Sequence, residues 1–313
     1  MQFLTIAVCT RLRPKMLAEL LQSCTSLMVP SCFELRILVV ESGPEQVAKS
    51  IVEKFQSDLS VTYFHQPEIG VVRARNMAID AFLATDSAWL GFIDDDEVLS
   101  AEWLAEIASA IHDYPDCNIF AGGAMMIEPE TSLPIFQSTK KLGRRRGQKL
   151  RIFCTQNVVF KRSIFAAEGR NARFDMRLNT VGGSDVLLSV QLSDRGESIR
   201  YVPAALSMET IPEERATFKF RTRKLMSQGH HAGLINLIHW GWFRGHILNL
   251  FFCFQSLIQA VVFTLIGGVV LVFNEKRGLW YIGRAVGRFY YGIGRPKILW
   301  RRPSDIYHVV QGY

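Results

Sequence analysis

A stretch without any charged side chain, residues 247–273, limits what the C-terminal part of this chain can fold into. As a single helix its roughly 27 residues would be about 40 Å long, enough to cross the hydrocarbon core of a membrane. Basic residues lie on both sides of the stretch, and because positive charge prefers the cytosolic side, both ends are expected to stay there. The polar Asn249 and Gln259 and the pair Gly267 and Gly268 suit a bent, re-entrant or in-plane helix. We therefore predict peripheral or re-entrant attachment, with a single span and a buried soluble helix as the alternatives.

The first two hundred residues have a different pattern, in which short β-branched runs alternate with longer runs of helical spacing. The candidate strands are FLTIAVC, LRILVVE, VTYFH, WLGFID, NIFAGGAMMI and NVVFK. The runs between the first five of them are PKMLAELLQSC, PEQVAKSIVEKF, GVVRARNMAIDAFLA and SAEWLAEIASAIHDY, with apolar residues at helical spacing. Pro14 and Ser100 sit where two of these helices are expected to begin. The alternation predicts an α/β fold with a mostly parallel sheet covered by helices.

Charge and cysteine content narrow the class of protein. Lys and Arg number 36 against 29 Asp and Glu, and the basic residues gather at 140–151 and again beyond residue 219. This distribution favours an anionic partner such as a phosphate, a membrane surface or a nucleic acid. The six cysteines form no CxxC pair and no zinc-site spacing, so we expect reduced thiols. The N-terminal MQFLTIAVCT has no basic leader, and a cytosolic body is therefore expected.

Four consecutive carboxylates, Asp94 to Glu97, follow the apolar run WLGFI. Adjacent acids raise one another's pKa unless a cation lies among them. In an open parallel sheet, ligands bind beyond the carboxyl ends of the strands, which is where this cluster is predicted to lie. Carboxylate oxygens suit Mg²⁺ or Mn²⁺ bound together with a substrate diphosphate. The alternative is a solvated loop whose acids favour the N-terminus of the next helix.

Two further motifs carry groups that suit the same chemistry. In PEIGVVRARNMAI, Arg75 lies near a predicted helix start, where guanidinium and backbone N–H groups can meet anionic oxygens. In GGSD, Asp185 follows a glycine pair at the start of an apolar helix and could accept a proton from an attacking hydroxyl. The alternative is that Ser184 or Asp185 is only an N-cap.

These motifs, in the order TIAVCTRLRP, ILVVESGP, GVVRARNMAI, GFIDDDEVLSAEWL, QNVVFKRS and GGSD, resemble the family 2 glycosyltransferases, which have a GT-A fold. The resemblance covers about residues 2–228 and is strongest to bacterial members of the succinoglycan glucosyltransferase type. It implies a GT-A domain at 1–228. The uncharged stretch 247–273 predicts a helical membrane-associating region at 229–313, in which the aromatics and spaced arginines of residues 279–293 are typical of an interfacial helix.

The resemblance also implies roles for individual residues. The residues expected to bind the nucleotide-sugar are Thr10, Arg11, Glu41, Arg75, Asp94 and Asp95. Asp96, with Asp94, is expected to bind Mn²⁺ or Mg²⁺, and Asp185 is expected to be the catalytic base. Contacts with the diphosphate or the acceptor are expected from Arg221, Arg223 and Glu209.

Three positions depart from the family pattern. Glu41 stands where the family usually has Asp, which leaves the nucleotide preference open. Ser184 replaces the glutamate that usually precedes the base. Glu209 falls near a position at which many relatives have a His.

The resemblance implies a metal-dependent, inverting transfer of a hexose, with glucose from UDP-glucose as the best guess. The acceptor would be a polyprenyl-diphosphate-linked sugar or a polysaccharide in bacterial cell-surface glycan synthesis, and the enzyme would work at the cytoplasmic face of the inner (plasma) membrane through residues 247–293. The alternatives are a nucleotidyltransferase acting on sugar phosphates and a non-catalytic membrane-bound partner that binds nucleotide-sugars. A nucleic-acid partner is not expected, because the basic run at 140–151 contains no stacking aromatic residues.

Overall fold

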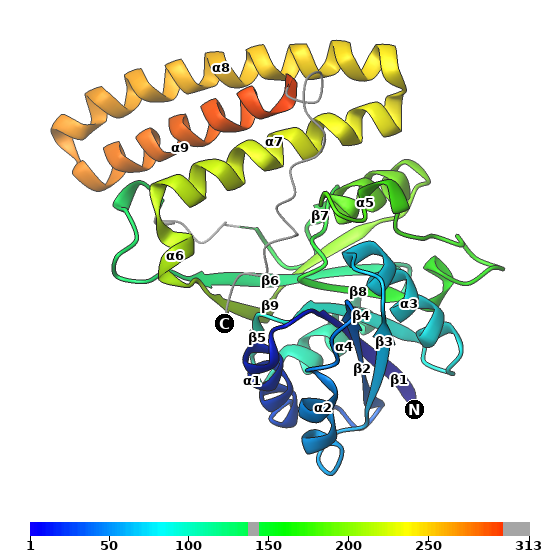
Figure 1. The fold of residues 1–313 in the computed structure, drawn as a ribbon. Helices are drawn as coiled ribbons and strands as arrows, with labels where there is room; N and C mark the ends of the chain where they lie inside the picture. The colour runs from blue at the N-terminus through cyan, green and yellow to red at the C-terminus, as the bar shows by residue number, and fades with distance from the viewer. Residues whose placement is uncertain (137–143, 297–313) are drawn as a thin grey trace. The chain divides into compact units, whose positions relative to one another are not determined.

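A computed structural model describes residues 1–136 and 144–296 of the chain. Within these residues the chain forms two compact units, one made of Met1–Met126 and Arg144–Thr210 and the other of residues 127–136 and 211–296. Each unit has its own architecture (Figure 1).

The first unit is an α/β structure around one sheet. Its strands are β1 (Gln2–Thr10), β2 (Phe33–Ser42), β3 (Val61–Gln66), β4 (Trp89–Asp94), β5 (Glu97–Leu99), β6 (Ile119–Ile127), β7 (Lys149–Leu150), β8 (Asn157–Lys161) and β9 (Ile199–Thr210). Its helices are α1 (Pro14–Thr25), α2 (Lys49–Phe55), α3 (Val71–Leu83), α4 (Trp103–Asp113) and α5 (Ser184–Asp194), with the short 3-10 helices η2 (Arg162–Ile164) and η3 (Met176–Leu178).

The strand order is β3-β2-β1-β4-β8-β6-β9-β5, with β7 paired to β9. The first four of these strands run parallel, and β8 continues the sheet antiparallel to β4. The chain moves outward from β1 through β2 to β3 and then returns to the other side of β1 with β4. The carboxyl ends of β1 and β4 therefore flank the point at which the strand order reverses, where open α/β sheets bind their ligands.

Helices cover both faces of this sheet, so the strands carry apolar residues on both sides. Along β1, Leu4, Ile6 and Val8 pack against α1, α2 and α4 on one face, whereas Ala7 packs with α3 and α5 on the other. The predicted α/β fold is thus confirmed. Helix α1 begins at Pro14 as expected, but α4 begins at Trp103 instead of Ser100. A turn in which the Trp103 amide donates to the Ser100 carbonyl precedes the helix, and the Ser100 amide donates to the Leu206 carbonyl of β9.

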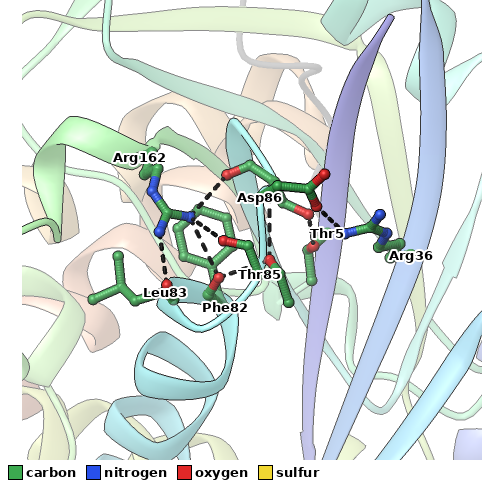
Figure 2. A network of polar contacts seen from close by, with 8 residues as sticks. Thr5, Arg36, Phe82, Leu83, Thr85, Asp86 and Arg162 are labelled. Carbon is green, nitrogen blue, oxygen red and sulfur yellow. Dashed lines mark hydrogen bonds and ion pairs between the residues drawn. The ribbon is translucent and has the colours of Figure 1, made fainter.

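The turn between α3 and β4 is held by one arginine from a distant part of the chain (Figure 2). Arg162 Nη2 donates to the carbonyl oxygen of Leu83 at 2.7 Å, and its Nη1 donates to that of Thr85 at 2.9 Å. A cation at these carbonyls satisfies groups that the helix end leaves without partners. Thr5 on β1 donates to Ser87 at 2.8 Å, so the start of β4 is held beside β1.

The second unit consists of η1 (Pro134–Phe136), α6 (Glu213–Ala216), α7 (Phe218–Trp240), α8 (Trp242–Phe273) and α9 (Glu275–Gly294). Helix α8 runs antiparallel to both α7 and α9, and all three pack side by side (Figure 1). The contacts are close: a Cβ atom added at Gly229 of α7 would lie 2.0 Å from the carbonyl oxygen of Tyr291, and one at Gly294 would lie 2.1 Å from that of Met226. Glycines therefore set how closely α7 and α9 approach.

Helix α8 has its large apolar side chains on the outside. The side chains that it buries against its neighbours are small or polar: Gly245, Asn249, Ser256, Ala260 and Gly267. Its exposed residues recur at intervals of three and four and form a continuous stripe, which we call the outer stripe: Phe243, Ile247, Phe251, Phe254, Ile258, Val261, Leu265, Val269 and Val272. By length and composition, α8 is the one helix in the described residues that could cross a membrane.

Candidate active site

The carboxyl ends of β1 and β4 are joined by hydrogen bonds to one carboxylate, Asp95. Thr10 Oγ1 donates to Asp95 Oδ2 at 2.7 Å, and Arg13 Nη1 donates to Asp95 Oδ1 at 2.8 Å. The Asp95 side chain is only 5% exposed, and burial raises its pKa although Arg13 opposes the shift. Because both of its oxygens are engaged, Asp95 anchors the loop after β4.

Arg13 is a site residue that the sequence analysis missed. Besides Asp95, its Nη1 contacts Asp96 Oδ2 at 3.3 Å, so this guanidinium partly neutralises the acidic cluster. The only signal in the sequence was a basic residue between the first strand and Pro14, close to where the acids were expected.

Asp94, Arg75 and Ser184 form a second connection, from β4 through α3 to α5. Arg75 Nη2 lies 3.6 Å from Asp94 Oδ1, and its Nη1 donates to Ser184 Oγ at 3.0 Å. The guanidinium also lies 5.5 Å from the ring centroid of Phe174. Ser184 stands where the resemblance implies a glutamate. It is buried, and it accepts this hydrogen bond from the arginine that faces Asp94.

Asp185 shares this site with the acidic cluster. It lies in the first turn of α5, after Gly182 and Gly183, whose φ values of +93° and +82° make the turn that starts the helix. Removal from bulk water, opposed by Arg75 and assisted by the charges of Asp96, Asp95 and Asp185, raises the pKa of Asp94 to about 7. The Asp94 side chain nevertheless keeps 43% of its surface exposed, so it remains accessible to a ligand.

At the end of β2, the two carboxylate oxygens of Glu41 differ: one accepts hydrogen bonds, and the other has no hydrogen-bond partner among the described residues. Oε2 accepts hydrogen bonds from Tyr63 Oη at 2.8 Å and from the Ala48 amide at 3.0 Å. Within the described residues, Oε1 is buried and has no partner. Burial and the bond to Glu41 raise the pKa of Tyr63, which keeps the phenol a donor. Glu41 is therefore positioned to accept one more hydrogen bond.

Arg11 has buried nitrogen atoms without partners as well. Its Nε and Nη1 are buried and make no hydrogen bond in the described part of the chain. Its Nε lies 3.3 Å from where a Cβ atom of Gly43 would be, and Gly43 has φ +119° just beyond β2. Unsatisfied donors beside the end of β2 suit a ligand that supplies acceptors.

The start of α3 is occupied by protein groups apart from Arg75. The Arg73 amide donates to Asn179 Oδ1 at 3.1 Å, and the Arg73 side chain pairs with Glu68 at 2.7 Å. Asn76 hydrogen-bonds the backbone of Phe174 through both its amide nitrogen and its oxygen. Of Arg73, Arg75 and Asn76, Arg75 is the one that faces the carboxylates.

Glu97 and Glu209 add two further carboxyl groups to this end of the sheet. They lie directly opposite each other in the antiparallel pair of β5 and β9. Glu97 is buried and accepts from Gln156 Nε2 at 3.1 Å. Burial raises the pKa of Glu97 to about 8, with contributions from the charges of Asp94, Glu209 and Asp96.

Arg221 and Arg223 belong to the second unit, on α7. Arg221 pairs with Glu128 of the same unit, and Arg223 is exposed. Their contact with a diphosphate or an acceptor stays a prediction.

The donor set suits a divalent cation bound together with a substrate. Within the described residues, no three His, Cys, Asp or Glu side chains are grouped closely enough to hold a metal ion. Asp94 and Asp96 supply hard oxygen donors, and their mutual repulsion favours a cation. Mg²⁺ and similar ions are usually bound by one or two carboxylates plus substrate phosphates, so the residues present fit such an ion.

The sequence is similar to known proteins. The sequence profile described as Glycosyl transferase family 2 matches residues 5–168. The chain is 27% identical over 241 residues to the succinoglycan biosynthesis protein ExoM of Rhizobium meliloti (strain 1021), covering 73% of this chain and 73% of that protein.

Solved structures show the same fold. One is the mannosyltransferase PcManGT from Pyrobaculum calidifontis, in complex with GDP-Man and Mn²⁺, which has a TM-score of 0.59 and 15% sequence identity. The match covers 95% of this chain and 87% of that protein chain. Another is S. aureus TarS 1–349, in complex with UDP-GlcNAc, which has a TM-score of 0.57 and 15% sequence identity. The match covers 96% of this chain and 92% of that protein chain. These similarities establish the GT-A fold.

Proposed function

We start from the fact that this chain belongs to glycosyl transferase family 2, and we propose that it transfers a hexose with inversion from a nucleotide-diphosphate-sugar to a lipid-linked or polysaccharide acceptor. The observation that carries the proposal is the convergence of Asp185, Arg75 and the Asp94 to Asp96 cluster at the carboxyl ends of β1 and β4. An acid at the start of a helix beside a cation-binding pair of carboxylates is the set of groups that this reaction needs.

In the proposed mechanism Asp185 accepts the proton of the acceptor hydroxyl as that oxygen attacks the anomeric carbon. Attack occurs opposite the leaving diphosphate, so the configuration inverts and no covalent intermediate forms. Asp94 and Asp96 would hold Mn²⁺ or Mg²⁺, which when bound stabilises negative charge on the departing diphosphate. Arg75 lies between Asp94 and Ser184, where its guanidinium can orient Asp94 and meet a phosphate oxygen.

For the donor we propose a uridine nucleotide carrying glucose, supported by the likeness to a succinoglycan biosynthesis protein. Glu41 Oε1, which is buried and without a partner in the described residues, is available to accept from an N–H of the base. Arg11 has the complementary unsatisfied donors. Thr10, through Asp95, holds the loop between this pocket and the carboxylates.

We further propose that residues 229–313 attach the catalytic domain, residues 1–228, to the cytoplasmic face of the inner membrane, with α8 lying in the plane of the interface. Support comes from Arg284 on α9, whose guanidinium is 5.8 Å from the ring centroid of Phe263. Phe263 is in the middle of the uncharged stretch. If α8 crossed a bilayer in this arrangement, Arg284 would lie near its centre, where a charged side chain costs about 3 kcal/mol or more. An in-plane helix instead places the outer stripe in lipid and the arginine near the headgroups.

The test is release of nucleoside diphosphate from UDP-, GDP- and dTDP-sugars by detergent-solubilised protein, with Mn²⁺ or Mg²⁺, with and without lipid-linked acceptors. Asp185→Asn should lower turnover by about 10²- to 10⁴-fold, the usual contribution of a general base. Asp96→Ala should abolish metal-dependent turnover. Asp194→Asn, the same change at the other end of α5, is the matched control and should keep wild-type activity.

Two results would contradict the proposal. Formation of pyrophosphate from a nucleoside triphosphate and a sugar phosphate would identify a nucleotidyltransferase. Wild-type turnover in both site variants would show that the acidic cluster takes no part in the chemistry.

A further inference from the structure

The second unit contains a groove that the proposed transfer reaction does not use. It lies between η1, α7 and α9 and has a volume of about 400 Å³. The lining residues that matter here are Phe136, Leu225, Trp280, Arg284, Arg288 and Tyr291. All of them belong to the second unit, and none was assigned a role in the chemistry of the first.

One face of α9 forms the floor of this groove. Trp280, Arg284, Arg288 and Tyr291 are spaced by four, four and three residues, which places them in one row along the helix. Glycines 283 and 287 lie between them and contribute no side chains, which leaves the groove open. A Cβ atom at Gly283 would lie 1.8 Å from the carbonyl oxygen of Ile135, so this glycine also allows η1 to approach α9 and form one wall.

Neither arginine has an acidic partner among the described residues. Within residues 1–136 and 144–296, Arg284 and Arg288 form no ion pair with a carboxylate, whereas Arg221 of the same unit is paired with Glu128. Arg284 instead lies over aromatic rings, 5.2 Å from the centroid of Trp280 and 5.8 Å from that of Phe263. Two uncompensated guanidinium groups in a row attract an anion with several acceptor oxygens.

The remaining walls are apolar. Phe136, Leu225 and the rings of Trp280 and Tyr291 offer hydrocarbon and aromatic surface next to the two cations. A free phosphate ion would gain nothing from such walls, whereas a phosphate carrying a hydrocarbon chain would bury that chain against them. Phe263 of α8, the ring beside Arg284, belongs to the same uncharged stretch that supplies the outer stripe, so Arg284 lies against the apolar helix.

We propose that this groove binds the phosphate group of a membrane lipid, with Arg284 and Arg288 contacting the phosphate and the apolar walls contacting the first part of the lipid chain. This inference rests on the proposed membrane attachment and adds a specific lipid site to it. The site would recognise the lipid phosphate itself, beyond the general attraction of basic residues to an anionic surface, which is worth about 1 kcal/mol for each of them.

The experiment titrates dihexanoyl phosphatidic acid into the full-length protein in neutral dodecyl maltoside micelles and measures binding by calorimetry, with dihexanoyl phosphatidylcholine and inorganic phosphate as comparison ligands. Arg284→Gln and Arg288→Gln should each weaken binding about tenfold, as expected for loss of a charge-assisted contact. Arg277→Gln, which removes the same charge from an exposed position at the start of α9, is the matched control and should change binding little.

A second variant tests the groove without removing charge. A Cβ atom at Gly287 would lie 4.0 Å from Leu225 Cδ2, so Gly287→Leu can be accommodated and its side chain would fill the groove. It should abolish binding of phosphatidic acid with both arginines present. The proposal is overturned if Gly287→Leu binds like wild type, if Arg277→Gln loses as much affinity as Arg284→Gln, or if inorganic phosphate binds as tightly as the lipid.

The micelle assay also separates this proposal from the proposed attachment. Protein that fails to bind phosphatidylcholine vesicles would contradict attachment through the outer stripe, yet phosphatidic acid in micelles would still report on the groove. If the protein binds vesicles but does not distinguish phosphatidic acid from phosphatidylcholine in micelles, the proposed membrane attachment stands and the proposed lipid-phosphate site in the groove is contradicted.

Discussion

The two units of this chain place their large apolar side chains in opposite positions. In the first unit Trp103, Phe160 and Phe82 are completely buried against the sheet. In the second unit Phe254 of α8 is 65% exposed, Val272 is 80% exposed, and the buried residues of the same helix are glycines, alanine, serine and asparagine.

The difference is consistent with the membrane attachment that we propose for the second unit. Water drives large apolar groups inward, so the first unit has a conventional core. Lipid gives no such drive, and helices in contact with it pack through small residues and a few polar contacts. Asn249 shows the second arrangement: its side chain donates to the Gly233 carbonyl at 2.9 Å and accepts from Asn236 at 2.8 Å, which joins α8 to α7.

The largest expected effect is on the free energy of unfolding. It distinguishes a phenylalanine in the core of the first unit from one in the outer stripe of the second. Phe160 stacks edge-on with Phe92, Phe153 and Phe165, so Phe160→Ala should lower the free energy of unfolding by about 3–5 kcal/mol. Phe254→Ala in α8 should change it by less than about 0.5 kcal/mol. Chemical denaturation in neutral detergent, followed by circular dichroism, measures both values. A large loss in Phe254→Ala would show that the outer stripe packs against protein.

The next effect concerns membrane binding. Phe254→Glu should weaken partitioning of the protein into phosphatidylcholine vesicles by roughly 10- to 100-fold, because a buried Phe side chain contributes about 1.5–3 kcal/mol. Met28→Glu changes a side chain of the first unit that is 58% exposed and should leave partitioning unchanged. Co-sedimentation with vesicles compares the two variants, and equal losses would remove the distinction between the units.

A smaller effect is expected on lowering the pH, and it should arise in the second unit. Burial, with the charge of His230, lowers the pKa of His231 on α7 to about 4. The folded protein therefore keeps this imidazole neutral, whereas the unfolded chain takes up a proton below pH of about 6.5. The contribution of His231 to stability is fully present above that pH and is lost as the pH falls toward 4.

Unfolding midpoints measured across this range should fall less in His231→Gln than in wild type. His112→Gln, which removes a 91% exposed histidine of the first unit, is the control. An identical pH dependence in wild type and His231→Gln would contradict the assignment.

The smallest effect on the free energy of unfolding is expected at the solvent-exposed surface of the first unit. Arg73 and Glu68 pair at 2.7 Å with side chains 38% and 63% exposed. Water solvates both charges, so Arg73→Gln should change the free energy of unfolding by less than about 1 kcal/mol. A much larger value, measured by the same denaturation assay, would show that the pair is shielded from water.

Some features of the fold and the site followed from local sequence. The alternation of β-branched and helical runs predicted the α/β fold, and Pro14 marked the start of α1. The prediction that α4 starts at Ser100 was wrong by one turn: Ser100 accepts from the Trp103 amide in the turn before the helix, and its own amide is bonded to a strand more than a hundred positions later. Arg13 was overlooked for a similar reason: its partner Asp95 is 82 positions away, and no local pattern connects them.

Composition and periodicity are local properties, and they were enough to identify the two kinds of segment, the uncharged stretch and the order of motifs that places the chain in its family. Tertiary structure alone decided the pairings across the chain. It joined Ser184 to Arg75, left one oxygen of Glu41 without a partner among the described residues, and turned the large side chains of α8 outward while Arg284 of α9 came to lie over Phe263. These outcomes depend on which distant groups compete for the same neighbours, and that competition is settled only when the sheet and the helices pack.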